Sequence, residues 1–169
     1  VVGNSLVAEY YGEPEAYVGT GRSGWGQMLE NFFTDDVEVV NWANSGTIAR
    51  TILATSYVGI MHSAQPGDYL IIESGYNDAN SKNETTEEQF KDYIQQMIDG
   101  CKAKGIIPIL VSPNASSHTW GAGIVYAPEM REVAAANPDV LFIDLTQKSF
   151  DYLNELYSGD RDIIDANFN

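Results

Sequence analysis

Short apolar runs alternate with longer segments of helical pattern along this chain, and this alternation most restricts the folds open to it. Runs bounded by turn residues occur at 37–42, 69–73, 106–111 and 140–143, and residues 1–2 have the pattern of a strand's end. Strands that alternate with helices pair in parallel, and the helices then cover both faces of the sheet. The sequence therefore predicts an α/β domain with five strands in a mainly parallel sheet.

The predicted helices lie between these strands, and the longest of them carries clear end signals. Either Thr85 or Thr86 could cap a helix over 86–104, and Gly105 would end it. The chain of 169 residues shows no repeat and no linker, which predicts one domain. The other predicted helices cover residues 24–33, 48–56, 129–136 and 146–156.

Charge and composition exclude several classes of function. The 24 acidic residues outnumber the 9 basic ones, and the net charge of −15 argues against nucleic acid and against strongly anionic partners, but not against neutral sugars. No apolar run approaches the ~20 residues that span a bilayer. The single cysteine, Cys101, excludes an internal disulfide, and the two histidines show no ligand spacing with it, so we expect no metal and no cofactor.

Small and polar residues follow three of the predicted strands. They occupy 3–5, 41–46 and 74–78. In open parallel sheets, ligands bind at the carboxyl ends of the strands, so we expect these segments at the binding edge. A glycine beside Ser5 lets the turn expose the hydroxyl, while the N–H of Gly46 and the amide of Asn77 could stabilise an oxyanion.

These segments resemble the conserved blocks of the SGNH (GDSL) hydrolases, and most of all the rhamnogalacturonan acetylesterase branch. That branch typically reads Gly-Asp-Ser, Gly-Trp-Gly-Gln, Asn-x-Ala-x-Ser-Gly and Gly-His-Asn-Asp. The corresponding blocks here are residues 3–5, 24–27, 41–46 and 75–78. The resemblance covers nearly the whole chain. It implies the SGNH fold, a flavodoxin-like three-layer sandwich with a five-stranded parallel sheet, as a single domain over 1–169 that is incomplete at both ends.

The resemblance also implies a reaction, a serine esterase that removes O-acetyl groups from plant cell-wall or other polysaccharides. Ser5 would attack the acetyl carbonyl and form an acetyl-enzyme that water then hydrolyses. The N–H groups of Ser5 and Gly46, with the Asn77 side chain, would hold the oxyanion. Candidate contacts to the polysaccharide, including aromatic rings that stack on sugar faces, are Tyr76, Asp78, His118 and Trp120.

Three departures from the family pattern concern the catalytic set. Asn4 replaces the usual Asp, and Tyr76 replaces the usual His before Asn77. The family also places Asp-x-x-His near the C-terminus, where this chain has Asp165 as the candidate carboxylate but reads Asn-Phe-Asn over 167–169. Either the base is lost, or the sequence is misread here, or the histidine follows Asn169.

The two histidines present are the other candidates for the base. His62 precedes the third strand and should lie at the far edge of the sheet, whereas His118 follows the fourth strand. A rival hypothesis is a catalytically inactive relative that serves carbohydrate binding, adhesion or extracellular assembly. Residues 19–24 also match G-x-G-x-x-G, but no clear strand precedes them, so nucleotide binding is a weak alternative.

The expected setting is extracellular. Asn83 and Asn114 begin Asn-x-Thr and Asn-x-Ser triplets in predicted loops, which makes both of them candidate glycosylation sites. The chain begins with Val1 rather than Met, so we expect processing or a larger parent polypeptide. The predicted partner is an acetylated polysaccharide or oligosaccharide, with no nucleic acid and no membrane span.

Overall fold

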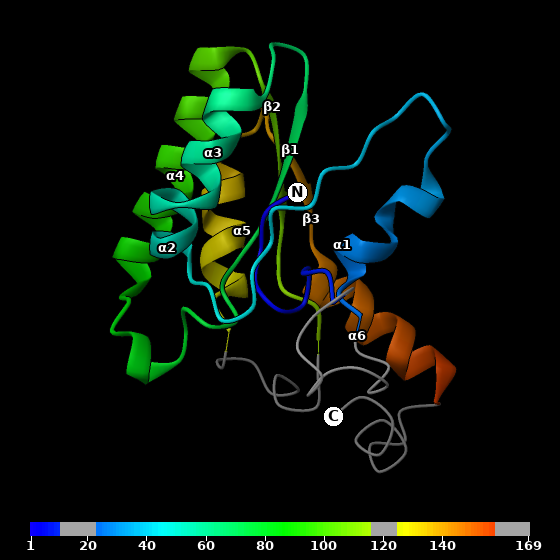
Figure 1. Ribbon diagram of the computed structural model, residues 1–169. Helices are drawn as coiled ribbons and strands as arrows, with labels where there is room; N and C mark the ends of the chain where they lie inside the picture. Colours follow the sequence, from blue (N-terminus) through cyan, green and yellow to red (C-terminus); the bar gives the residue numbers. More distant parts are fainter. Residues whose placement is uncertain (11–22, 116–124, 158–169) are drawn as a thin grey trace.

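The structure is a computed structural model that describes residues 1–10, 23–115 and 125–157. Its sheet has three parallel strands in the order β1-β2-β3, which are Tyr69–Glu73, Ile107–Val111 and Leu141–Ile143. Strand β1 pairs with β2 over its whole length, with Ile71 opposite Ile109. The parallel arrangement follows from the helices that connect the strands, as Figure 1 shows.

The prediction of five strands is wrong for the described part of the chain, where three form the sheet. The first of the two missing segments still runs beside β1, and the second runs beside the first. Val2 forms a parallel bridge with Ile72. The N-terminal amino group of Val1 donates to Val40 O and the Trp42 N–H donates to Val1 O, both at 2.8 Å. Each contact extends over one or two residues, so neither segment reaches the length of a strand.

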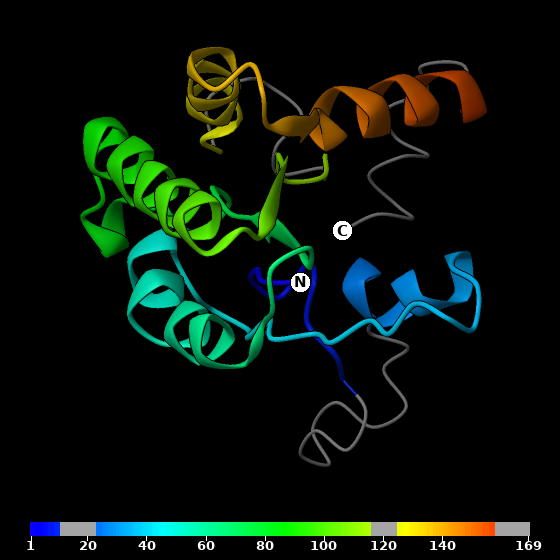
Figure 2. The same cartoon turned by 90° about the horizontal axis from the view of Figure 1, so that it is seen from above.

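The helices form two layers on opposite sides of the sheet (Figures 1 and 2), so the predicted three-layer α/β architecture is confirmed. One layer packs around α4, whose buried Phe90, Ile94, Met97 and Ile98 belong to the same core as Leu110 of β2. That layer consists of α2 (Ala49–Ala54), α3 (Ser56–Ser63), α4 (Glu87–Lys104) and α5 (Ala127–Ala136), and the other contains α1 (Trp25–Met28), the 3-10 turn η1 (Leu29–Phe32) and α6 (Leu145–Leu156).

The helices follow the sequence signals closely, with one exception. The helix predicted over 48–56 ends at Ala54, because Thr55 leaves the helical conformation (φ −128°, ψ −87°), and α3 then begins at Ser56. Helix α3 was not predicted. A further 3-10 turn, η2, covers Ser81–Asn83. In residues 1–10, 23–115 and 125–157, no helix is both long and apolar enough to cross a membrane.

Helix α4 has both of the end signals that the sequence predicts. Thr86 accepts a hydrogen bond from the Gln89 N–H at 3.2 Å, and the Gln89 side chain accepts one from the Thr86 N–H at 3.0 Å. This capping box satisfies two N–H groups that the first turn of a helix otherwise leaves unpaired. At the other end Gly105 has φ +77°, the left-handed conformation that glycine adopts without strain.

Thr86→Ala is expected to destabilise the domain by about 1 kcal/mol, because it removes the acceptor of the N-cap. Thermal unfolding followed by circular dichroism should show Tm lower by about 2–4 °C. Thr86→Ser keeps the hydroxyl and should melt close to the wild type. Equal Tm values for the alanine and serine variants would show that the cap contributes nothing.

Candidate active site

The Ser5 turn is a tight bend that Asn4 organises from both its backbone and its side chain. Asn4 O accepts hydrogen bonds from the N–H groups of Val7 and Ala8, both at 3.0 Å. The Asn4 side-chain oxygen accepts from the Leu6 N–H at 2.8 Å. Asn4 itself is completely buried, whereas Ser5 is half-buried. The bend therefore places Ser5 at the carboxyl end of the first segment, as predicted.

Hydrogen bonds to residues at the start of α1 support this turn. The Trp25 N–H donates to Leu6 O at 2.8 Å, and the Gln27 side chain accepts from the Tyr10 N–H at 3.0 Å. A Cβ at Gly26 would lie 2.5 Å from Val7 O, so only glycine allows this approach. The Gly-Trp-Gly-Gln segment at 24–27 thus has a physical role in holding the bend.

The second turn is hydrogen-bonded to the first. Gly3 O accepts from the Asn44 N–H at 3.1 Å and from the Thr47 hydroxyl at 3.0 Å. The Asn41 amide donates to Val7 O at 2.8 Å. Gly46 is exposed at the tip of this turn with φ +78°, in the left-handed region. Its backbone is thus accessible at the same edge of the sheet as the Ser5 turn.

The third turn is hydrogen-bonded to the second. The Asn77 amide nitrogen donates to Thr47 O at 2.9 Å, and Asn77 O accepts from the Asn83 amide at 2.7 Å. Asn77 and Tyr76 are both half-buried. The three turns that carry Ser5, Gly46 and Asn77 are therefore linked in series at the carboxyl edge, with Thr47 as the residue common to both links.

Asp78 follows Asn77 but points inward. One carboxylate oxygen accepts from the Ala49 N–H at 2.8 Å, and the other accepts from the Ser74 hydroxyl at 2.8 Å and the Gly75 N–H at 3.0 Å. Only 1% of the residue is exposed. Burial raises the pKa of Asp78, while these hydrogen bonds act in the opposite direction. Asp78 thus joins the end of β1 to the start of α2, and the substrate contact suggested for it stays a prediction.

Asp78→Asn is expected to lower the free energy of unfolding by about 1–3 kcal/mol, since the new NH₂ group faces backbone N–H donors and leaves at least one of them unpaired. Tm should fall by about 2–10 °C in a thermal melt. Asp92→Asn, at an exposed position on α4, is the matched control and should change Tm little. Equal melting of the two variants would contradict the structural role of Asp78.

Glu73 is a buried acid at this edge that the sequence analysis did not select. The residue has no exposed surface, and its carboxyl oxygens lie 3.5 Å from the backbone N and the side-chain Nδ2 of Asn4. Burial is the main reason that the pKa of Glu73 rises to about 8. Glutamate is almost never fully buried without a partner, so its place at the end of the apolar run 69–73 was the available signal.

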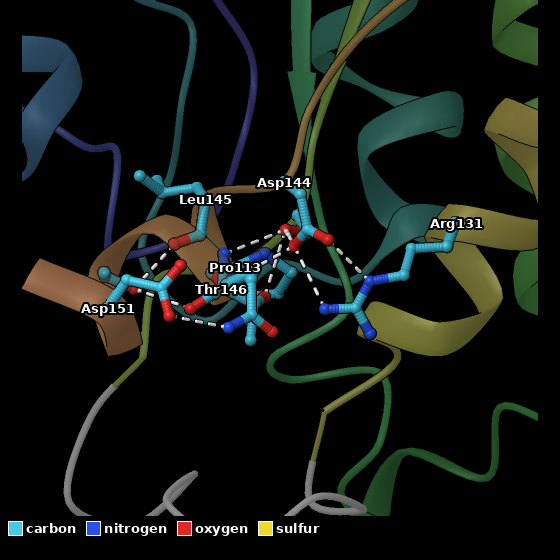
Figure 3. A network of polar contacts seen from close by, with 9 residues as sticks. Pro113, Arg131, Asp144, Leu145, Thr146 and Asp151 are labelled. Atoms are coloured by element: carbon cyan, nitrogen blue, oxygen red, sulfur yellow. Dashed lines mark hydrogen bonds and ion pairs between the residues drawn. The ribbon is translucent and has the colours of Figure 1, made fainter. Parts of the chain in front are cut away.

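A second polar network holds the chain after β2 and β3 (Figure 3). Arg131 donates to both carboxylate oxygens of Asp144, at 2.6 and 3.0 Å. Ser112 donates to Asp144 at 3.1 Å and accepts from the Thr146 N–H at 3.0 Å. Burial raises the pKa of Asp144, but the hydrogen bonds from Arg131 and the Gln147 N–H outweigh it and leave the pKa below its usual value. The network anchors the start of α6 to the end of β2.

One candidate residue lies away from this edge, and others fall outside the described residues. His62 lies in the last turn of α3, where its Nδ1 is 3.1 Å from Val58 O, before the chain enters β1 at Tyr69. It is therefore at the opposite edge from Ser5, as expected. Outside the described residues lie His118, Trp120, Asp165 and most of the 19–24 glycine motif.

The side-chain amides of both candidate glycosylation residues donate hydrogen bonds within the protein. Asn83 donates to Asn77 O at 2.7 Å, and Asn114 donates to Ala115 O at 3.2 Å. Their modification stays a prediction. Within the described ranges, no group of three or more His, Cys, Asp and Glu side chains is placed to hold a metal ion.

Comparisons with known proteins agree with this arrangement of turns. The profile of the GDSL-like Lipase/Acylhydrolase family matches residues 1–164. The probable rhamnogalacturonan acetylesterase YesY of Bacillus subtilis (strain 168) is 31% identical over 146 residues, which is 80% of this chain and 67% of that protein. The uncharacterized esterase YxiM of the same organism is 36% identical over 115 residues, or 67% of this chain but 29% of that protein.

Solved structures show the same fold. The crystal structure of YxiM from Bacillus subtilis superposes with a TM-score of 0.81 and 29% identity, over 92% of this chain and 45% of that one. An acetylxylan esterase from Geobacillus stearothermophilus has a TM-score of 0.69 and 16% identity, over 90% of this chain and 78% of that one. From the family profile over residues 1–164 and the similarity to YesY, we conclude that the chain belongs to the GDSL-like lipase/acylhydrolase (SGNH) family, in its rhamnogalacturonan acetylesterase-like branch.

Proposed function

We propose that the chain is a serine esterase that removes O-acetyl groups from polysaccharides, with Ser5 as its nucleophile. The observation that carries this proposal is the hydrogen-bonded series of turns at the carboxyl edge. Gly3 O accepts from Asn44 and Thr47, and Asn77 donates to Thr47 O. A serine hydroxyl and several N–H donors are thereby gathered on three connected turns, which is what acyl transfer requires.

The reaction would proceed through an acetyl-enzyme. The Ser5 hydroxyl attacks the acetyl carbonyl, and its proton passes to a base. N–H donors stabilise the negative charge on the oxygen of the resulting tetrahedral intermediate. The side-chain nitrogen of Asn77 carries two hydrogens, of which the bond to Thr47 O uses one. The second hydrogen is the one proposed to reach the oxyanion, together with the N–H groups of Ser5 and Gly46. The intermediate collapses as the bond to the sugar oxygen breaks, and the sugar hydroxyl leaves with the proton held by the base. Water then hydrolyses the acetyl-enzyme, which releases acetate and restores the Ser5 hydroxyl.

The base must come from outside the described residues. His62 is the one histidine that they contain, and it lies at the opposite edge of the sheet. Within this sequence His118 is the remaining imidazole, and Asp165 is the proposed carboxylate partner of the base. Both stay candidates for substitution.

The proposed substrates are acetylated, and the names of the relatives support this class. YesY is a probable rhamnogalacturonan acetylesterase, and the Geobacillus stearothermophilus relative is an acetylxylan esterase. The net charge of −15 favours the less anionic of such polysaccharides, because a polyanionic chain would be repelled. Tyr76, His118 and Trp120 are proposed to contact the sugar, and a polymeric plant substrate fits the proposal that the protein acts outside the cell.

Acetate release from defined polysaccharides tests the function. The purified chain would be incubated with acetylated xylan, acetylated rhamnogalacturonan and the same polymers after chemical deacetylation. We expect acetate from the acetylated polymers, no acetate from the deacetylated controls, and no change in polymer length. If neither polymer nor p-nitrophenyl acetate releases acetate above the uncatalysed rate, the esterase proposal fails.

The absence of an imidazole near Ser5 among the described residues favours one second candidate, a non-catalytic carbohydrate-binding relative. The same samples separate the two. Retention on immobilised polysaccharide without any acetate release would support the binding domain. Acetate release would exclude it.

A further inference from the structure

Tyr10 contacts the candidate nucleophile directly through its hydroxyl. The hydroxyl donates a hydrogen bond to Ser5 O at 2.9 Å, and Tyr10 itself is half-buried. The Leu6 N–H, which belongs to the same peptide group as Ser5 O, donates to the Asn4 side-chain oxygen at 2.8 Å. The peptide group that follows Ser5 is therefore held at both its oxygen and its N–H.

The peptide group that precedes Ser5 is held at its oxygen alone. That oxygen, Asn4 O, accepts from the N–H groups of Val7 and Ala8, both at 3.0 Å. In the part of the chain that the structure describes, the Ser5 N–H of this group has no acceptor. Because peptide groups are planar, contacts to the two groups that flank Ser5 fix both of its backbone torsion angles. The direction of the Ser5 Cβ is then fixed, and the Ser5 N–H remains available for an oxyanion.

The backbone that carries Tyr10 is anchored to α1. The Tyr10 N–H donates to the Gln27 side-chain oxygen at 3.0 Å, and the Gly24 N–H donates to Ala8 O at 3.2 Å. Gly24 is the N-cap of α1, and Gln27 lies within that helix. The Tyr10 hydroxyl therefore reaches Ser5 O from a fixed position, and among the described residues it is the sole donor to that oxygen.

We propose that Tyr10 is a positioning residue for Ser5: its hydroxyl holds the peptide group between Ser5 and Leu6, and so keeps the Ser5 side chain and N–H oriented for acyl transfer. The link to catalysis rests on the proposed esterase function, whereas the hold on the peptide group does not. Tyr10 acts through the backbone of Ser5 rather than on the substrate, so loss of its hydroxyl should lower kcat and leave KM nearly unchanged. A misplaced nucleophile reacts slowly, because the reacting atoms must be aligned before the bond forms.

Two variants of the full chain test the proposal. Tyr10→Phe removes the hydroxyl and keeps the ring, so the packing of the ring is retained. Tyr57→Phe is the matched control, because the hydroxyl of the buried Tyr57 donates to Met97 O at 2.9 Å and joins α3 to α4. Each variant loses one hydrogen bond from a tyrosine hydroxyl to a backbone carbonyl, but only the first loses it at Ser5. The kcat and KM for p-nitrophenyl acetate report the nucleophile, and hydrogen exchange of the Leu6 amide reports the peptide group.

In Tyr10→Phe, kcat should fall about tenfold while KM stays within about twofold of the wild-type value. The Leu6 amide should exchange about fivefold faster, because its peptide group has lost one of its two hydrogen bonds. The next two amides along the chain, whose acceptor is Asn4 O, should exchange at nearly the wild-type rate. Tyr57→Phe should leave kcat and the exchange of Leu6 unchanged, although its Tm falls by a few degrees.

The proposal is overturned if Tyr10→Phe keeps a wild-type kcat, if its Leu6 amide exchanges at the wild-type rate, or if Tyr57→Phe loses as much kcat. Should Tyr10→Phe not fold, Gln27→Met removes the acceptor of the Tyr10 N–H and should also lower kcat, and an unchanged kcat would then overturn the proposal. An inactive wild type with the expected exchange pattern would refute the esterase and support the hold on the peptide group. An active wild type whose Tyr10→Phe variant has unchanged kcat and exchange would do the reverse.

Discussion

Ser5→Ala is expected to lower kcat/KM for acetyl esters at least about a thousandfold, because it removes the atom that forms the acetyl-enzyme. Ser5 is half-buried in the first turn, and its side chain donates none of the hydrogen bonds that hold the bend, which the N–H groups of Leu6, Val7 and Ala8 donate to Asn4. Tm should therefore stay near the wild-type value. Initial rates on p-nitrophenyl acetate and acetate release from acetylated xylan would be measured side by side.

The matched control for this variant is Ser63→Ala. Ser63 ends α3 at the opposite edge, where its hydroxyl contacts Gly59 O at 3.2 Å. It loses the same atom far from the proposed site and should keep full activity. Activity of Ser5→Ala within tenfold of the wild type would assign any esterase reaction to another residue.

Elements whose signals are local were predicted well. Strand β1 was placed correctly at Tyr69–Glu73, because an apolar run of strand length follows the turn at Pro66 and Gly67. Helix α4 was predicted to within a residue, since Thr86 and Gly105 mark its ends. In both cases the residues that decide the structure are neighbours in the sequence.

Helix α3 and the outer part of the sheet depend on partners that are distant in the sequence. In α3, Gly59 lies so close to Trp42 that an added Cβ would come within 2.9 Å of the ring, and Tyr57 donates to Met97 O of α4 at 2.9 Å. Tertiary packing of this kind overrides a weak local pattern. The segment 37–42 has the composition of a strand, but the hydrogen bonds that pair it with another segment join Val40 and Trp42 to Val1.

The candidate active site shows the same division between features set by neighbouring residues and features set by residues distant in the sequence. Small and polar residues after three strands were sufficient to predict that Ser5, Gly46 and Asn77 belong to turns at one edge, because the topology of a parallel sheet brings strand ends together. The inward orientation of Asp78 was not predictable, because its acceptor role depends on the Ala49 N–H, which lies 29 residues away in the sequence. The contacts of Glu73 with Asn4, 69 residues away in the sequence, were not predictable for the same reason.

Asn77→Ala is expected to reduce kcat by about 10²–10³-fold if its amide donates to the oxyanion, the usual effect of removing one such donor. The substitution also removes the bond from Asn77 Nδ2 to Thr47 O, which joins the second and third turns. A buried or half-buried hydrogen bond of this kind contributes about 1 kcal/mol to stability, so Tm should fall by a few degrees as well. The kcat on p-nitrophenyl acetate and Tm would be measured on the same samples.

The control must separate loss of the donor from loosening of the third turn, and Asn83→Ala does so. The Asn83 amide supports Asn77 through the Asn77 backbone oxygen, at 2.7 Å, and offers nothing to the proposed oxyanion. Asn83→Ala should therefore lower Tm about as much as Asn77→Ala while kcat changes less than about tenfold. If both variants lose activity equally, the effect of Asn77 acts through the turn, and the oxyanion would depend on the backbone N–H groups of Ser5 and Gly46 alone.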